Sequence, residues 1–155
     1  MGEIDKALEI YRKLVSLLYR EIGAMVRNNH PMLYDGSKLA GSTFAKERKQ
    51  RARDIYCDSR GERDPDAIAE LYRRETGLSL DQVHQAFREG DWLLGRSKHS
   101  FGGPKWAKIA EAAADLRQTI RDRDETAAVV TLKQVEVLQH NNGPIVDKFR
   151  ELWCE

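Results

Sequence analysis

The 155-residue sequence has few cysteines, no long apolar run and almost no net charge. Its two cysteines, Cys57 and Cys154, form no CxxC motif. This usage is typical of two reduced thiols in a cytoplasm, although the sequence also permits a disulfide between them. No apolar segment approaches the roughly 18 residues of a membrane span, and the charged N-terminus lacks the apolar core of a signal peptide. The 26 basic and 25 acidic residues select no partner by overall charge. We therefore expect a cytoplasmic protein without a membrane segment.

The common signatures of catalysis are also missing. The sequence contains no HExxH, no GxSxG and no His/Cys pairs at metal-binding spacing. His99 stands in a polar segment, but spacing gives it no partner carboxylate. His140 is followed by asparagines and a glycine that are typical of a helix end. An enzyme is not supported, and we expect no cofactor and no metal.

What the sequence does have is helical periodicity. Apolar residues recur at alternating steps of four and three along the first segment, which predicts a long amphipathic helix over 4–28. This heptad stripe consists of Ile4, Leu8, Tyr11, Val15, Leu18, Ile22 and Met25. The stripe fits either the core of this chain or pairing with a second chain. If the stripe does not lie in the core, we expect this helix to bind a second copy of the chain or another protein.

The remaining chain alternates helical patterns with turn signals. The segments expected to be helical are 4–28, 43–57, 65–76, 80–89, 104–120, 126–139 and 144–153. The valine-rich segment 126–139 resembles a strand in composition, but its spacing favours a helix, and "RDRDE" at 121–125 fits either a tight turn or a helical continuation. The prediction is an all-α fold of about seven helices in orthogonal or bundle packing. We expect one domain over 1–155, with the helix 4–28, a core at 43–95 and C-terminal helices within 104–153.

Two of these helices carry strong end signals. Asp64 followed by Pro65 is typical of a helix start, and Gly77 suits a left-handed C-terminal cap. Ser79 and Gln82 then form a capping box for the next helix, which we expect to stop near Gly90.

The segment "IAELYRRETGLSLDQVHQAF", residues 68–87, resembles a helix-turn-helix DNA-binding motif. Gly77 stands at the turn, Leu78 at the core position behind it, and Val83 and Ala86 at inward positions of the second helix. Arg73 departs from the motif, which usually has alanine there so that the two helices approach closely. The same pattern fits an ordinary helical hairpin with a well-capped second helix.

The resemblance implies that the second helix enters a major groove and reads bases with outward side chains. The expected reading residues are Asp81, Gln82, His84, Gln85 and Arg88. Phosphate contacts would come from two basic segments, and the residues expected to make them are Lys46, Arg48, Lys49, Arg51, Arg53, Arg96, Lys98 and Lys105. The function hypothesis is nucleic-acid binding, with duplex DNA favoured and no catalysis. The alternative is a helical protein–protein adaptor without nucleic-acid affinity.

The stretch "GRSKHSFGGPKW", residues 95–106, has three interpretations. Its glycines and Pro104 fit a connector that ends in a helix start, where free amides also favour an anion. Catalysis by His99 is the third interpretation and the least supported.

Overall fold

The computed structural model describes residues 2–29, 45–94 and 103–140, and these residues form helices without any strand. The helices are α1 (Glu3–Asn29), α2 (Ala45–Asp58), α3 (Pro65–Thr76), α4 (Leu80–Leu94), α5 (Gly103–Asp122) and α6 (Glu125–His140). The prediction of an all-α fold is confirmed. The expected helix 144–153 and the polar segments around 31–42 and 95–102, with Arg96, Lys98 and His99, lie outside the described residues.

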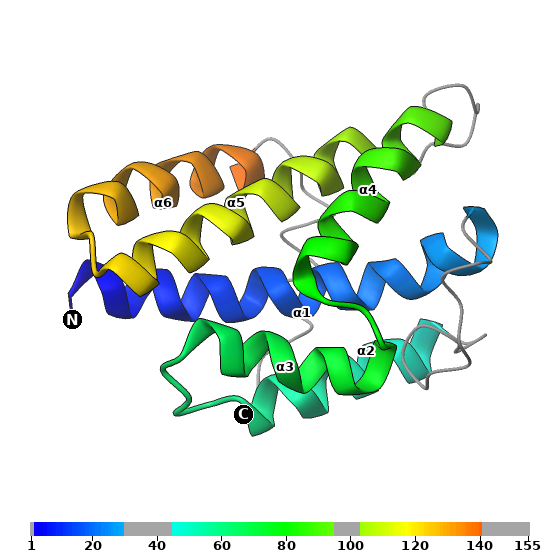
Figure 1. Cartoon of the computed structure of the whole chain (residues 1–155), viewed down its shortest axis with the longest axis horizontal. Helices are drawn as coiled ribbons and strands as arrows, with labels where there is room; N and C mark the ends of the chain where they lie inside the picture. Colours follow the sequence, from blue (N-terminus) through cyan, green and yellow to red (C-terminus); the bar gives the residue numbers. More distant parts are fainter. Residues whose placement is uncertain (1, 30–44, 95–102, 141–155) are drawn as a thin grey trace.

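Helix α1 runs through the middle of the molecule and contacts each of the other five helices (Figure 1). Helices α2 and α3 lie along one side of it, α5 and α6 lie along the other, and α4 crosses α1 steeply. Helix α5 is the second hub, because it packs against α1, α3, α4 and α6. One hydrophobic core joins side chains from all six helices.

The heptad stripe of α1 belongs to this core. Leu8, Tyr11, Val15, Leu18 and Ile22 are buried, and Ile4 packs against the core at its edge. Side chains between the stripe positions are buried as well, among them Leu14 and Leu17, so that α1 is covered on most sides. Residues 4–22 of the stripe are therefore covered by the chain's own helices, which corresponds to the core alternative of the two interpretations.

The ends of α3 and the start of α4 follow the predicted caps. The Asp64 carboxylate accepts the N–H of Asp66, and Gly77 adopts a left-handed φ of 74° while its N–H donates to the Arg73 carbonyl at 2.7 Å. The capping box is formed in both directions, with Ser79 and Gln82 exchanging hydrogen bonds of 2.8 and 3.1 Å. Helix α4 differs from its expected end, since it continues through Gly90 to Leu94. A glycine inside a helix costs only about 1 kcal/mol, which the rest of the helix offsets.

Polar bonds fasten α3 to α1 along its length. Beneath the first turn of α3, the Tyr11 hydroxyl donates to the Pro65 carbonyl at 2.8 Å. In the middle of the helix, Ser16 and Tyr72 share a buried hydrogen bond. Beyond its last turn, the Tyr19 hydroxyl donates to the Leu78 carbonyl at 2.8 Å. Burial raises the pKa of Tyr11, Tyr19 and Tyr72 above the ordinary value of 10.0, so these three hydroxyls keep their protons at any physiological pH.

The turn between α5 and α6 resolves the alternatives left open for "RDRDE". Helix α5 ends at Asp122, and Arg123 adopts a left-handed φ of 52°. The Asp124 carboxylate then accepts the N–H of Ala127 at 3.0 Å and caps α6. The valine-rich segment is a helix, as its spacing predicted.

Candidate nucleic-acid interface

The turn between α3 and α4 positions the face that was expected to read bases. Both helices carry their apolar residues inward, with Ile68 and Tyr72 on α3 and Val83 and Phe87 on α4. They pack on α1 and α5, however, and hardly touch one another. Arg73 lies on the exposed side of α3, where it holds the Glu70 carboxylate at 2.6 Å. The hairpin is thus more open than the compact helix pair of a helix-turn-helix motif.

Three polar side chains line the outward face of α4. Gln82, Gln85 and Arg88 are all exposed and follow each other at intervals of three residues. Arg88 donates to the Gln85 side-chain oxygen at 2.9 Å, and the capping bond of Gln82 uses only its oxygen, so that its amide group keeps its donors. This face therefore offers donors of the kind that read adenine and guanine.

The one carboxylate expected on this face is compensated by a cation of another helix. Asp81 is exposed at the start of α4, and Arg117 of α5 donates to it at 2.9 Å. The partner guanidinium offsets the repulsion that a free carboxylate would exert on phosphate.

His84 differs from the other expected reading residues. Its Nε2 atom is buried without a hydrogen-bond partner, and the carboxylates that influence it include Glu111 and Asp115 of α5. Burial, followed by the charge of Arg88, lowers its pKa below the ordinary 6.5, so the ring is neutral at pH 7. His84 thus faces α5 and lies beside the outward face instead of on it.

The basic segment of α2 lies next to the α3–α4 turn. Arg51 forms an ion pair with Glu75 in the last turn of α3, which joins α2 to the end of the hairpin. Lys46 is exposed, and Arg48, Lys49 and Arg53 are partly exposed. Within residues 46–53, Glu47 is the single carboxylate against these five cations. The fold therefore places the predicted basic segment 46–53 beside the end of α3.

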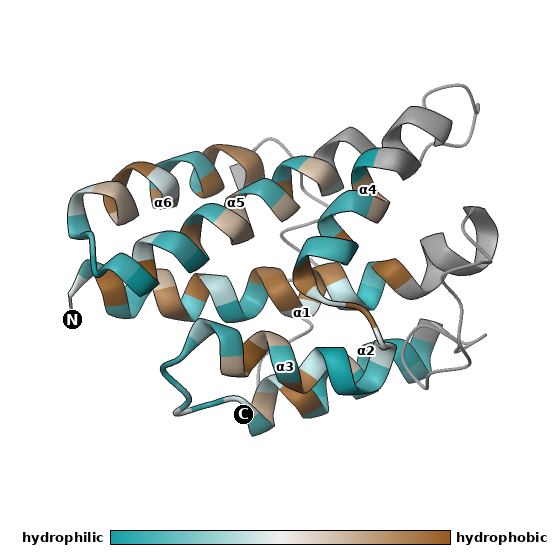
Figure 2. Ribbon diagram, in the orientation of Figure 1, coloured by the Kyte–Doolittle hydropathy of each residue, from teal (hydrophilic) through white to brown (hydrophobic). Residues whose placement is uncertain are grey.

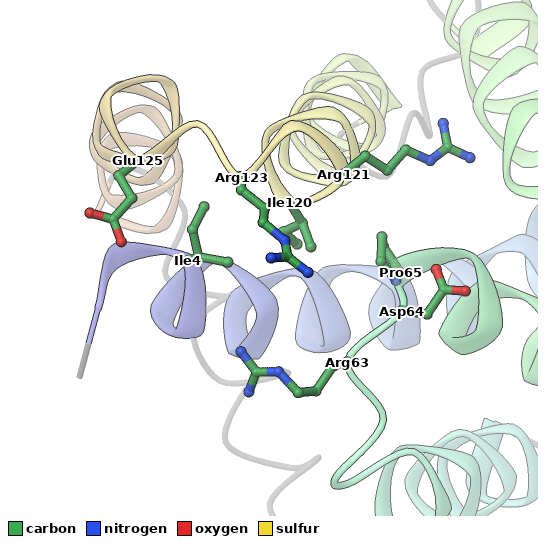
Figure 3. A pocket seen from close by; sticks show the side chains of 8 residues that line it. All are labelled: Ile4, Arg63, Asp64, Pro65, Ile120, Arg121, Arg123 and Glu125. Carbon is green, nitrogen blue, oxygen red and sulfur yellow. The ribbon is translucent and has the colours of Figure 1, made fainter.

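A surface hollow lies at the opposite end of α3 from the α3–α4 turn (Figure 3). It measures about 630 Å³, and its walls come from the starts of α1 and α3 and from the α5–α6 turn. Arg63 is paired with Asp5 at 2.6 Å, and Arg121 donates to Asp66 at 3.0 Å.

Arg123 also points into this hollow in Figure 3, but the charges around it are balanced. The carboxylates of Asp64 and Glu125 line the same walls. With Arg63 and Arg121 already neutralised by Asp5 and Asp66, the remaining charge does not favour an anion. We assign no ligand to this hollow.

Other chemistry is limited among the residues that the structure describes. They contain no cluster of three His, Cys, Asp or Glu side chains able to hold a metal ion. None of their helices combines the length and apolar character that crossing a membrane requires.

Cys57 is disulfide-bonded, which corrects the expectation of a reduced thiol and removes the support that cysteine usage gave to a cytoplasmic location. Cys154, the other cysteine of the sequence, lies outside the described residues.

Comparison with known proteins gives no relative for this arrangement: no family model, no curated protein and no solved structure matches the chain.

Proposed function

We propose that the protein binds nucleic acid, with duplex DNA as the first expected ligand, and that it does so without catalysing a reaction. The observation that carries the proposal is the ion pair between Arg51 and Glu75, because it holds the basic segment 46–53 beside the turn from which α4 starts. Cations and hydrogen-bond donors that are far apart in the sequence thereby share one end of the molecule. Phosphate contacts supply most non-specific affinity, and donors on an adjoining helix add base preference.

The exposed cations at the end of α3 extend this surface. Arg73 and Arg74 follow Glu70 on the outer side of α3, one turn before Gly77. Two arginines against one carboxylate leave a positive charge near the turn. The proposal requires that the first turns of α4 are accessible, and the exposure of Gln82 and Gln85 supports it. It does not require that α3 and α4 pack tightly together.

The test is fluorescence anisotropy with a short labelled duplex at about 50 and 200 mM salt, the range over which a protein that neutralises several phosphates loses affinity steeply. We expect binding at the lower salt. Combining Lys46→Ala, Arg48→Ala and Lys49→Ala should weaken it for every sequence and flatten the salt dependence by about 0.9 in log–log slope for each phosphate that the variant no longer neutralises. Arg51 is kept because it pairs with Glu75.

The matched control removes three cations from the opposite end of the molecule, with Lys6→Ala, Arg60→Ala and Arg123→Ala. It changes the net charge by the same amount and should leave the affinity close to that of the wild type. Gln85→Ala should change the preference among duplex sequences more than the salt slope. Absence of wild-type binding at about 50 mM salt would contradict the proposal.

A protein–protein adaptor is the second candidate function, and the outer face of α6 favours it. Val130 and Val137 of this helix are 54% and 59% exposed. Exposed apolar side chains that share a face are typical of contact surfaces. A wild-type protein that fails to bind any duplex while it binds another chain would support the adaptor instead.

A further inference from the structure

Helix α6 has an unusual distribution of apolar residues for a helix at the edge of a bundle. It packs on α1 and α5 through Ala128, Leu132 and Val135. Among the side chains that the structure describes, the two large apolar ones that are exposed are Val130 and Val137, and both belong to this helix. Figure 2 shows hydrophobic colouring along α6, at the margin of the molecule farthest from α2 and α3. A surface helix normally places polar residues on its outer side, so the outer side of α6 is typical of a helix that becomes covered.

The two valines belong to one surface. Residues seven apart lie on the same side of a helix, about 10 Å from each other. Lys133 and Gln134 lie between them on that side and are also exposed. The stripe therefore has an apolar residue at each end and a polar pair at its centre.

A groove next to the stripe extends this surface onto α5. It measures about 360 Å³ and runs between α5 and α6, with Ala112, Val137 and Leu138 among its lining residues. Lys108, Glu111 and Asp115 of α5 border it, so charges of both signs surround its apolar lining. We name the outer side of α5 and α6, comprising this groove and the Val130–Val137 stripe, the α5–α6 face.

We propose that the α5–α6 face is a self-association surface and that its occupant is a second copy of this chain. A twofold axis passing between Lys133 and Gln134 would set the two α6 helices antiparallel. Val130 of one copy would then lie opposite Val137 of the other, and Lys133 opposite Gln134. Twofold symmetry requires such self-complementarity, in which residue i meets j and j meets i.

The mixed charges around the groove support the same occupant. A partner that differed from this chain would be selected most easily by a border of one sign, whereas Lys108 on one copy and Glu111 or Asp115 on the other can pair across an axis. Helices of 20 and 16 residues, about 1.5 Å per residue long and about 10 Å wide, give each copy a face of roughly 500 Å². This is at the small end of specific interfaces, so we expect dissociation constants in the micromolar range.

The test is the molar mass in solution, measured by light scattering across a dilution series up to about 100 μM chain. We expect twice the chain mass at the upper concentrations. The variant with Val130→Glu and Val137→Glu should be a monomer, because each glutamate would face another glutamate across the axis. Gln50→Glu on α2, an exposed position on the other side of α1, controls for a negative charge added outside the face and should associate like the wild type.

A charge-paired variant tests the register of the two helices. With Val130→Glu and Val137→Lys, each glutamate faces a lysine of the other copy, and we expect association to return to at least one tenth of the wild-type affinity. Thermal unfolding followed by circular dichroism should be unchanged for the two variants on α6, because Val130 and Val137 are exposed. A wild-type monomer at about 100 μM overturns the proposal and leaves the face to a different partner. A charge-paired variant as monomeric as the double glutamate variant overturns the antiparallel register.

Discussion

Helices α3 and α6 are both peripheral, and both pack on α1 and α5, but they are attached by different forces. Helix α3 is held at its start, middle and end by the hydroxyls of Tyr11, Tyr72 and Tyr19. Helix α6 is held by apolar side chains such as Ala128 and Val135. Hydrogen bonds depend on direction, whereas apolar burial does not. The position of α3 is therefore specified more narrowly than that of α6.

The outer faces of the two helices also differ: that of α3 is charged, and that of α6 exposes apolar side chains. Arg73 and Arg74 of α3 each form an ion pair with Glu70, in contact with water. Val130 and Val137 occupy the corresponding side of α6. The outer surface of α3 is thus typical of a solvated helix, and that of α6 is typical of a helix with a partner. The difference separates a peripheral helix with an outer face of paired charges from one that exposes apolar side chains.

The largest effect on stability is expected when Tyr72, which attaches α3 to α1, is replaced. Tyr72 is fully buried, stacks on Tyr19 with ring centroids 5.1 Å apart and bonds Ser16. Tyr72→Ala should lower the free energy of unfolding by about 3–5 kcal/mol, as removal of a large buried ring usually does. Val130→Ala on α6 should change it by no more than about 0.5 kcal/mol. Urea denaturation of both variants measures the difference, and equal losses would contradict the comparison.

A smaller effect is expected where only one hydroxyl is removed. Tyr19→Phe keeps the ring but leaves the buried Leu78 carbonyl with only the long hydrogen bond of 3.5 Å from the Thr76 hydroxyl, which should cost about 1–3 kcal/mol. Tyr56→Phe is the matched control, because the Tyr56 hydroxyl donates to the Glu9 carboxylate, which is partly exposed and can turn to water. Its loss should therefore be smaller. Thermal unfolding of the two variants shows which one loses more stability. A larger loss for Tyr56→Phe than for Tyr19→Phe would show that α3 does not depend on the hydrogen bond between Tyr19 and Leu78.

The smallest effect concerns pH. The attachments of α3 use tyrosines whose pKa is raised by burial, so they do not titrate between about pH 5 and 8. His84, whose pKa is lowered below 6.5, lies between α4 and α5 near Asp81, Glu111, Asp115 and Arg88. Just below pH 6.5 the unfolded chain binds more protons at this position than the folded one, so stability falls as the pH is lowered through that range.

The variant His84→Gln should show less of this loss than the wild type. Urea midpoints at about pH 7.5 and 5.5 for both proteins measure it, and the other histidines are common to both. Identical pH dependence in the two proteins would mean that His84 is as solvated in the folded chain as in the unfolded one.

Local signals in the sequence were enough to predict the helices and several of their ends. The caps at Asp64, Gly77 and Ser79 act within a few residues, and the structure confirms them. Gly90 shows the limit of such signals, because a glycine permits a helix end without requiring one. The burial of the heptad stripe in the chain's own core could not be decided from spacing, since the same spacing serves a core and a dimer.

The candidate site depended more on tertiary structure. Helical periodicity identified Gln82, Gln85 and Arg88 as neighbours, and all three are exposed. It could not show that α5 covers the flank of α4 on which His84 lies. Nor could it show that Arg51 meets Glu75, because ion pairs across 24 residues depend on how α2 and α3 lie along α1.

The tyrosine bonds at the two ends of α3 have a consequence for which changes of chain length the protein tolerates. Tyr11 and Tyr19 are eight residues apart on α1 and reach the carbonyls of Pro65 and Leu78. An inserted residue within α3 would rotate everything after it by about 100° and move it by about 1.5 Å, so one of the two hydroxyls would lose its acceptor. The spacing of Tyr11 and Tyr19 on α1 therefore fixes the number of residues in α3. We expect insertions and deletions to be rejected in 65–78.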